Sequence, residues 1–377
     1  MKKNIVFLGI SVLLFLLLNL SFRSSQPIDI GQLRELYSGP KEKWPVPNVD
    51  EDIVFNELGP LVAPPLLKKR DSLKNIHALG RLLFFDPRLS TSEQISCSSC
   101  HAPDLNWTDG RRTSVGHNHS YHSRNTPSLE NVWANKSYFW DGRANTIEEQ
   151  SRQSISSPIE MHQDPEKLPG KIKKIKGYAP YFEAAYGKKS INTQNILHAI
   201  AIYVQTIQSR KSDFDFFLEG QKDRLTDEQV LGLHLFRTKA RCINCHNGPF
   251  FTDNNFHNVG ITLYGKENRE DLGRYNITKN PEDVGKFKTP GLRNVIRSRP
   301  WFHNGIFDNI GGLINLYSMG MVQPKPTKAQ ENDPLFPKTS PHIKRLNLTL
   351  EERNAIIAFL NAITSAPLRD TPPQLPK

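Results

Sequence analysis

The sequence predicts a mainly α-helical protein with two domains, and three observations lead to this prediction. Helix-type apolar spacing recurs along the chain, with capping sequences before several segments, and no run of alternating apolar and polar residues suggests a sheet. A five-residue motif, Cys-x-x-Cys-His, occurs twice and uses all four cysteines. The length of 377 residues leaves room for two hydrophobic cores of ordinary size, one for each motif.

The chain begins with a predicted targeting segment. Lys2 and Lys3 precede an apolar run over 5–20, which is the charged-then-apolar order of a secretory signal. Because the run is slightly shorter than the roughly 18 to 20 residues of a membrane span, residues 1–22 are assigned to a signal peptide, with an uncleaved N-terminal anchor as the alternative. Residues 23–66 are polar and proline-rich and are expected to form a lead segment without long helices.

The first domain is predicted over residues 67–220. Its first helix is expected over 68–85, where apolar residues recur at helical spacing until an Asp-Pro pair ends the pattern. A loop-like stretch follows the first motif up to about Trp133, and loops of such length are usually functional. A capping box at 146–149 opens the next helix, and an apolar stripe predicts another over 193–209.

The second domain is predicted over residues 221–365. A capping box at 226–229 begins a helix that leads into the second motif, and another at 349–352 begins the last helix. Residues 366–377 remain as a tail.

Both copies of the five-residue motif have the pattern of covalent haem c attachment. The two thiols can form thioethers with the haem vinyl groups, and the adjacent histidine can then bind the iron. The sequence therefore predicts two covalently bound haem c groups, with His101 and His246 as proximal ligands. The attachment cysteines are Cys97 and Cys100 in the first copy and Cys242 and Cys245 in the second.

Two other uses of the motif fit less well. The cysteine pairs of a zinc site usually lie within about 20 residues of each other, whereas Cys100 and Cys242 are 142 positions apart. A thioredoxin-like redox pair would be expected near a βαβ pattern and requires no histidine after it.

The charge of the chain argues against a nucleic-acid partner. The formal net charge of +11 includes the lysines of the targeting segment, and the propionates of two haems would add about four negative charges. The basic residues are spread through the sequence without a long run, so no nucleic-acid binding is expected and an acidic redox partner stays open.

The function of each haem depends on what lies opposite its proximal histidine, because an open distal face lets a small molecule reach the iron. After the first motif the loop contains His117, His119 and His122. Isolated loop histidines are usually solvated, but three within six residues suggest that one is a ligand or guards the pocket.

Six blocks of sequence, in the same order, resemble bacterial dihaem cytochrome c peroxidases, including MauG-like proteins. The resemblance implies two cytochrome c-like domains, each with one covalent haem, packed so that the haems are linked across the interface. It also implies that the first domain is the peroxidatic one and the second the electron-transfer one. The blocks are 79–86, 124–127, 139–143, 248–253, 292–295 and 302–305.

The resemblance implies three catalytic residues around the first haem. His117 matches a switchable distal ligand that binds the iron at rest and swings away on activation, and its glycine-flanked polar loop suits such a motion. Glu160 matches the carboxylate that moves a proton between the two peroxide oxygens. Trp140 matches the tryptophan between the two haems.

The resemblance also implies further metal ligands. Asn125 matches the side-chain ligand of a calcium ion, with the backbone carbonyls of Ser298 and Pro300 as further contacts, and oxygen ligands suit Ca²⁺. Tyr317 occupies the position of the distal ligand of the second haem, where well-studied peroxidases carry methionine and MauG carries tyrosine. A small shift in register would instead offer Met319 or Met321.

The leading function is therefore reduction of hydrogen peroxide in the periplasm, with electrons from a small cytochrome c or cupredoxin and, by family analogy, in a homodimer. One alternative is MauG-like oxidation of tryptophan or tyrosine in a partner protein, which Tyr317 favours. The other is a dihaem electron carrier without peroxide chemistry.

Overall fold

The computed structural model describes residues 29–368 and 370–377, so the predicted signal or anchor at 1–22 lies outside the described residues. The described chain confirms the prediction of a mainly helical protein, since its β-structure comprises an antiparallel pair, β1 (Phe256–His257) and β2 (Phe287–Lys288), and isolated bridges. The α-helices are α2 (Ile30–Tyr37), α3 (Arg70–Phe85), α4 (Cys97–Cys100), α5 (Ile147–Ser156), α6 (Leu168–Lys174), α7 (Ala179–Tyr186), α8 (Thr193–Val204), α9 (Asp213–Leu218), α10 (Asp227–Arg237), α11 (Tyr275–Thr278), α12 (Ile310–Ser318) and α13 (Leu350–Ala362).

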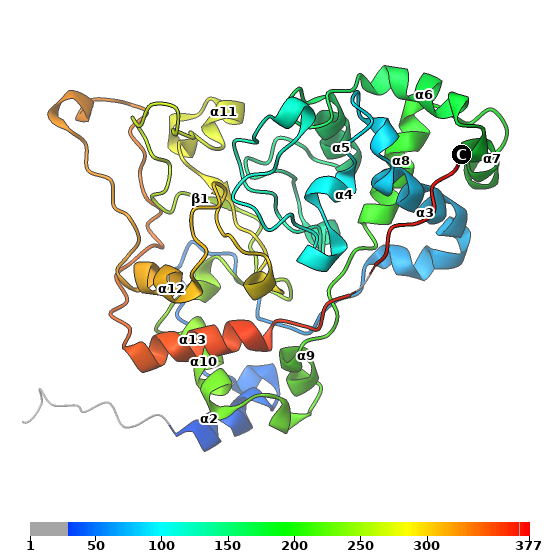
Figure 1. Cartoon of the computed structure of the whole chain (residues 1–377). Helices are drawn as coiled ribbons and strands as arrows, with labels where there is room; N and C mark the ends of the chain where they lie inside the picture. The colour runs from blue at the N-terminus through cyan, green and yellow to red at the C-terminus, as the bar shows by residue number, and fades with distance from the viewer. Residues whose placement is uncertain (1–28, 369) are drawn as a thin grey trace, which may run out of the picture.

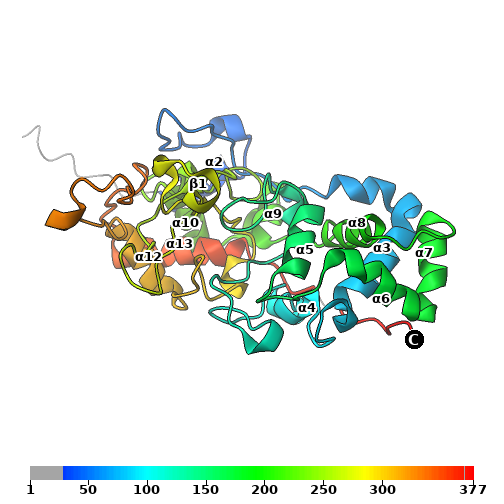
Figure 2. The ribbon, with the colours of Figure 1, turned by 90° about the horizontal axis from the view of Figure 1, so that it is seen from above.

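Two large hydrophobic clusters organise the helices (Figures 1 and 2). The first core consists of buried residues between Leu79 and Ile207, and in it α8 packs against α3 and α5. The second core joins buried residues from 33–58 to others from 214–363, and in it α10 packs against α13 and α2. Among helices of the described residues, none is long and apolar enough to cross a membrane.

A glycine sits at the closest point of the main helix crossing in each core. A Cβ atom added at Gly80 of α3 would lie 1.9 Å from the carbonyl oxygen of Ala199 in α8. A Cβ atom added at Gly232 of α10 would lie 1.9 Å from the carbonyl oxygen of Ala355 in α13. Both cores therefore use the same packing, in which the two helix backbones lie too close at the crossing point for any residue other than glycine.

Each terminal segment of the described chain packs on the core that is farther from it in sequence. The N-terminal segment packs on the second core, where Tyr37 and Trp44 enclose the buried guanidinium of Arg237 and Glu57 forms an ion pair with it. The C-terminal tail instead returns to the first core and ends beside α7 (Figure 1). The domain limits at 67, 220 and 365 stay a prediction.

The helix limits agree with the predictions in part. The helix expected over 68–85 starts at Arg70 and ends, as expected, at Phe85. Complete capping boxes open α10 at Thr226 and α13 at Thr349. At α5 the box is only half formed, because the Glu149 carboxylate accepts a hydrogen bond from the amide of Asn145 instead of that of Thr146. The helix predicted over 193–209 ends at Val204.

Candidate functional site

The first motif presents a buried imidazole with a fixed orientation. Ser96 and Ser99 cap the short helix α4 reciprocally, which sets the two cysteines on one turn. His101 follows, and its Nδ1 lies 2.9 Å from the carbonyl oxygen of Trp107. Because a carbonyl only accepts, Nδ1 carries the proton and Nε2 keeps a free lone pair. Burial lowers the pKa of His101, which favours this neutral, ligand-ready form.

The second motif repeats this geometry. Cys242–Asn244 form a 3-10 turn, and Nδ1 of His246 lies 2.9 Å from the carbonyl oxygen of Phe251. Burial again lowers the pKa of the histidine and leaves Nε2 free. Both predicted proximal histidines are thus oriented by one backbone carbonyl five or six residues further along the chain, as metal-binding histidines generally are.

The cysteines suit thioether bonds better than metal ligation. None of the four forms a disulfide. Burial raises the pKa of Cys97 and Cys242 to about 12, so their surroundings oppose the thiolate that a zinc ion would need. A thioether carries no charge, so the same apolar surroundings accept it. The donor set therefore fits two covalently bound haem c groups.

Each motif opens into its own cavity. The first cavity is lined by Cys97, Cys100, His101 and Glu160, together with apolar side chains of α5 and α8. The second cavity is lined by Cys242, Cys245, His246 and Tyr317, together with apolar side chains of α12 and α13.

The two cavities share part of their walls. Trp140 is one of the shared residues, and its Nε1 donates a hydrogen bond of 2.8 Å to the carbonyl oxygen of Asn125. The predicted tryptophan thus lies between the cavities, and the carbonyl of Asn125, another shared residue, accepts its indole hydrogen bond. The shared residues are Asn125, Thr126, Pro127, Ser128, Asn135, Trp140, Lys288 and Pro290.

The three loop histidines lie in different surroundings. His117 does not line the first cavity; its ring packs against His162 at 4.6 Å between centroids, and its Nδ1 is buried without a hydrogen-bond partner. His119 is exposed. His122 lines the cavity, and its Nε2 is also buried without a partner. Of these three loop histidines, His122 is therefore the one that lines the first cavity.

The loop of His117 is fastened to the segment of Glu160. The amide of His117 donates a hydrogen bond of 2.8 Å to the Glu160 carbonyl oxygen. A Cβ atom added at Gly116 would lie 2.1 Å from the Ile159 carbonyl oxygen, so only glycine allows the two segments to approach this closely. A backbone hydrogen bond and a close backbone contact thus join the segment of the predicted distal ligand, His117, to the segment of the predicted catalytic carboxylate, Glu160.

The three candidates for the distal ligand of the second haem, one tyrosine and two methionines, differ in position. Tyr317 lines the second cavity, and burial raises the pKa of its hydroxyl. Met319 is 59% exposed, and Met321 is buried away from the cavity lining.

The predicted calcium ligands line the second cavity together. Asn125 is buried, and its Nδ2 donates hydrogen bonds to the carbonyl oxygens of Arg111 and Arg112. This fixes the amide so that Oδ1 is left for another partner. Ser298 and Pro300 line the same cavity.

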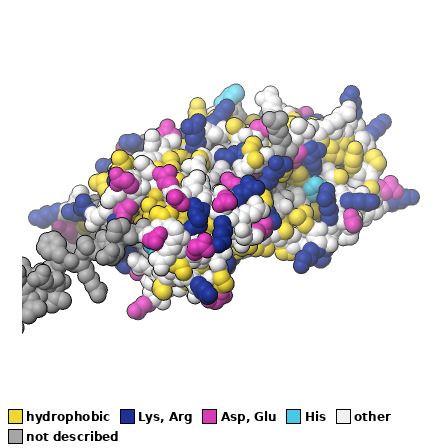
Figure 3. Space-filling model, turned by 90° about the horizontal axis from the view of Figure 1, so that it is seen from below, with side chains coloured by type: hydrophobic (Ala, Val, Ile, Leu, Met, Phe, Trp, Pro, Cys, Tyr) yellow, Lys and Arg dark blue, Asp and Glu magenta, His cyan; other side chains and the backbone are white. Residues whose placement is uncertain are grey.

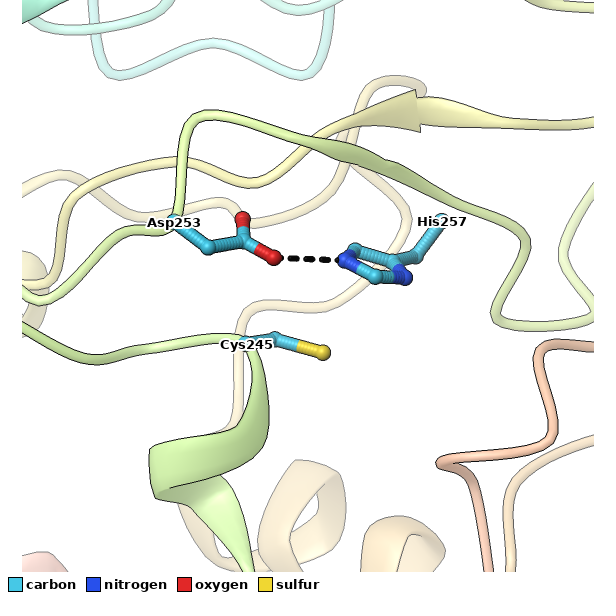
Figure 4. Close-up of side chains that lie close together, drawn as sticks. All are labelled: Cys245, Asp253 and His257. Atoms are coloured by element: carbon cyan, nitrogen blue, oxygen red, sulfur yellow. Dashed lines mark hydrogen bonds and ion pairs between the residues drawn. The ribbon is translucent and has the colours of Figure 1, made fainter. Parts of the chain in front are cut away.

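A further polar cluster adjoins the second motif. Cys245, Asp253 and His257 have potential metal-binding atoms within 4.8 Å of one another, and His257 Nε2 lies 2.8 Å from the Asp253 carboxylate (Figure 4). Because Cys245 belongs to the haem attachment motif, its thiol is not available to a separate metal ion.

Sequence reasoning missed His257 and Lys288 as cavity residues and did not single out His122 from its neighbours. No spacing in the sequence could have found Lys288, because it meets Trp140 only through the fold. Its amide donates a hydrogen bond of 2.8 Å to the Trp140 carbonyl oxygen.

Comparisons with known proteins identify the family of this chain. A family model described as "Di-haem cytochrome c peroxidase" matches residues 74–223. The cytochrome-c peroxidase IdrP1 of Pseudomonas sp. (strain SCT) is 31% identical over 348 residues, covering 85% of this chain and 89% of the relative. The methylamine utilization protein MauG of Methylorubrum extorquens is 33% identical over 304 residues, covering 79% and 81%.

Solved structures give the same result. A MauG-like protein associated with microbial copper homeostasis superimposes with a TM-score of 0.69 at 27% identity, covering 85% of this chain and 93% of that protein. With relatives at this identity over most of both chains, this chain belongs to the di-haem cytochrome c peroxidase family, which includes MauG.

Proposed function

We propose that this protein is a dihaem c-type peroxidase that reduces hydrogen peroxide to water, with electrons from a small periplasmic cytochrome c or cupredoxin. The observation that carries the proposal is that one cavity is lined by both His101 and Glu160. In the overall reaction, one peroxide takes up two electrons and two protons and leaves as two water molecules.

The two cysteine pairs would hold the haem groups, with His101 and His246 as proximal ligands. When bound, the first haem supplies the iron at which peroxide is reduced, and the second haem supplies a store or relay for electrons. Trp140, shared by both cavity walls, would shorten the path between the two sites.

Glu160 would act as the proton carrier. A carboxylate in the cavity can take the proton of one peroxide oxygen and return it to the other, so that water is the leaving group. His117 would be the switchable ligand, and its backbone hydrogen bond to Glu160 supports a coupled motion of the two segments. Rotation of the His117 side chain toward the cavity would close the site.

Replacing Glu160 tests the proposal. Glu160→Gln keeps the size and polarity of the side chain but cannot accept a proton, and it is expected to lower peroxide turnover with reduced cytochrome c by about 10²–10⁴-fold. Glu148→Gln is the matched control, because Glu148 lies in the neighbouring helix α5 outside the cavity lining. Equal turnover in both variants, with two haems bound, would remove Glu160 from the mechanism.

We also propose one bound Ca²⁺, with Asn125 Oδ1 and the backbone carbonyls of Ser298 and Pro300 as protein ligands. The support is that these residues line one cavity and that hard oxygen atoms suit calcium. Chelation with EGTA is expected to lower turnover in the wild type and to have no further effect in Asn125→Ala.

The organisation of the protein follows from the same proposal. Residues 67–220 and 221–365 would be the peroxidatic and electron-transfer domains, in a protein exported to the periplasm and assembled as a homodimer. The first core, which lies within 67–220, supports the first domain, whereas Phe214 and Phe217 of the same range belong to the second core.

A second candidate function is MauG-like oxidation of a tryptophan or tyrosine in a partner protein. Tyr317 favours it, because it lines the second cavity whereas Met319 is exposed. A phenol oxygen bound to the second haem would favour oxidised iron, and the two haems could then share oxidising equivalents.

A further inference from the structure

Lys288 occupies a special position between the two cavities. It is the last residue of β2, pairs with Phe256 of β1, and lines both cavities. Its amide is bound to the carbonyl oxygen of Trp140, the aromatic residue of the shared wall. Its backbone is therefore positioned by the strand pairing and by the hydrogen bond to Trp140, independently of what its ammonium group contacts.

The ammonium of Lys288 lacks the carboxylate that neighbouring cations have. Within residues 29–368 and 370–377 it has neither an ion pair within 4.0 Å nor a hydrogen-bond acceptor. The other Arg and Lys side chains that line the cavities form ion pairs: Arg124 with Asp141 and Asp271, Arg143 with Asp141, Arg241 and Lys344 with Asp50, and Arg293 with Asp215.

An anion beside the Lys288 ammonium would stabilise its positive charge. Lys288 is half-buried, and the surrounding protein lowers its pKa to about 8, mainly by burial, with the charge of Asp253 acting in the opposite direction. An ammonium taken out of water without a partner is costly. The two proposed haem groups would bring anions to these cavities, because each haem carries two propionates.

We propose that Lys288 binds a propionate carboxylate at the boundary of the two cavities and is the positive charge that the two haem sites share. This inference rests on the proposed dihaem function. A cation at this point stabilises the reduced, less positive iron more than the oxidised iron, so Lys288 is a positioning residue that also raises the reduction potential of at least one haem.

The test measures reduction potentials in the purified protein with both haems bound, by optical redox titration without peroxide. Lys288→Met and Lys288→Gln are expected to lower the midpoint potential of at least one haem by about 59 mV. For one electron this corresponds to an about tenfold lower ratio of reduced to oxidised iron at a fixed solution potential. Lys288→Arg keeps the charge and is expected to stay near the wild type.

Lys286→Met is the matched control. Lys286 lies two residues away, is paired with Asp283 at 3.2 Å and does not line either cavity. Its variant removes the same charge and is expected to leave both potentials unchanged. If the Lys288→Met and Lys288→Gln potentials equal those of this control, the inference is wrong.

A second measurement covers the case in which the uncharged variants do not take up two haems. The propionate bending bands in the resonance Raman spectrum are expected to differ between the wild type and Lys288→Arg, because the guanidinium changes the hydrogen bond to the carboxylate. Identical bands would overturn the inference. Neither measurement involves turnover, so a peroxidase assay that fails would count against the proposed function and not against the role of Lys288.

Discussion

At the scale of single residues, Tyr317 distinguishes the two proposed functions. It lines the second cavity, and burial raises the pKa of its hydroxyl. If it binds the second haem, the wild type is expected to lack a sulfur-to-iron charge-transfer band in the near infrared, and Tyr317→Met is expected to gain one and to raise the potential of that haem. Met319→Leu is the control and is expected to change neither, because Met319 is exposed. A sulfur band in the wild type that disappears in this control would assign the ligand to Met319.

Asp50 predicts how stability depends on pH. Burial raises the pKa of its carboxyl, but hydrogen bonds from His342, Arg241 and Lys344 outweigh this and hold the pKa well below its usual value. A lowered pKa stabilises the fold above the unfolded-state value of about 3.9, and this contribution is lost progressively as the pH falls from there through the lower folded-state pKa. Asp50→Asn is therefore expected to lower the urea midpoint at pH 7 and to matter progressively less toward pH 3. A pH-independent difference would contradict this account.

At the scale of elements, the helix crossings in the two cores depend on glycine. Gly80→Ala and Gly232→Ala would each bring a methyl group against a backbone carbonyl that cannot rotate away, so each is expected to lower the free energy of unfolding by about 1–3 kcal/mol or more. Gly170→Ala in α6 is the control, since an added Cβ there meets nothing within 4 Å. It is expected to stabilise the protein by about 0.5–1 kcal/mol. Urea unfolding of the three variants measures both signs.

The elements also explain which features could be predicted from the sequence. The capping boxes of α10 and α13 were predictable because their partners lie three residues apart. The end of α8 was not, because the chain leaves the helix to contact Asn131. Asn131 donates hydrogen bonds to the Ile207 carbonyl oxygen and the Ser209 hydroxyl and accepts one from the Ser209 amide. The apolar stripe of 193–209 continues through this turn, since Ile207 is buried there as well.

The same distinction holds for the candidate site. The attachment residues follow from a local motif, and a backbone carbonyl close in sequence orients each histidine. The approach of Lys288 to Trp140 joins segments almost 150 positions apart, and no periodicity carries that information. Its detection required the fold.

At the scale of the whole molecule, each core is covered by a segment that belongs by sequence to the other end of the chain. The N-terminal segment is held on the second core by Arg237 and by Asp215, which accepts a hydrogen bond of 2.6 Å from the Leu61 amide. The tail is held on the first core near α7, where the Gly177 amide donates to the Lys377 carbonyl oxygen. The face shown in Figure 3 carries interspersed acidic and basic side chains. Cohesion between the two cores therefore depends on these crossing segments as well as on the shared cavity wall.

Asp370 is the main polar anchor of the tail and provides the test of this cohesion. Its carboxylate accepts hydrogen bonds of 2.6 Å from Arg81 in α3 and 2.7 Å from Tyr203 in α8, across the central crossing of the first core. Asp370→Ala is expected to lower the free energy of unfolding by about 1–2 kcal/mol, because two partly buried partners lose a charged acceptor. Deletion of 370–377 is expected to cost more, since it also uncovers the apolar surface beneath Leu375. Gln374→Ala, at an exposed tail position, is the control. Urea unfolding with limited proteolysis would show cleavage beginning in α3 and α7 of the truncated protein. Unchanged stability and an unchanged cleavage pattern would mean that the tail rests on the first core without holding it.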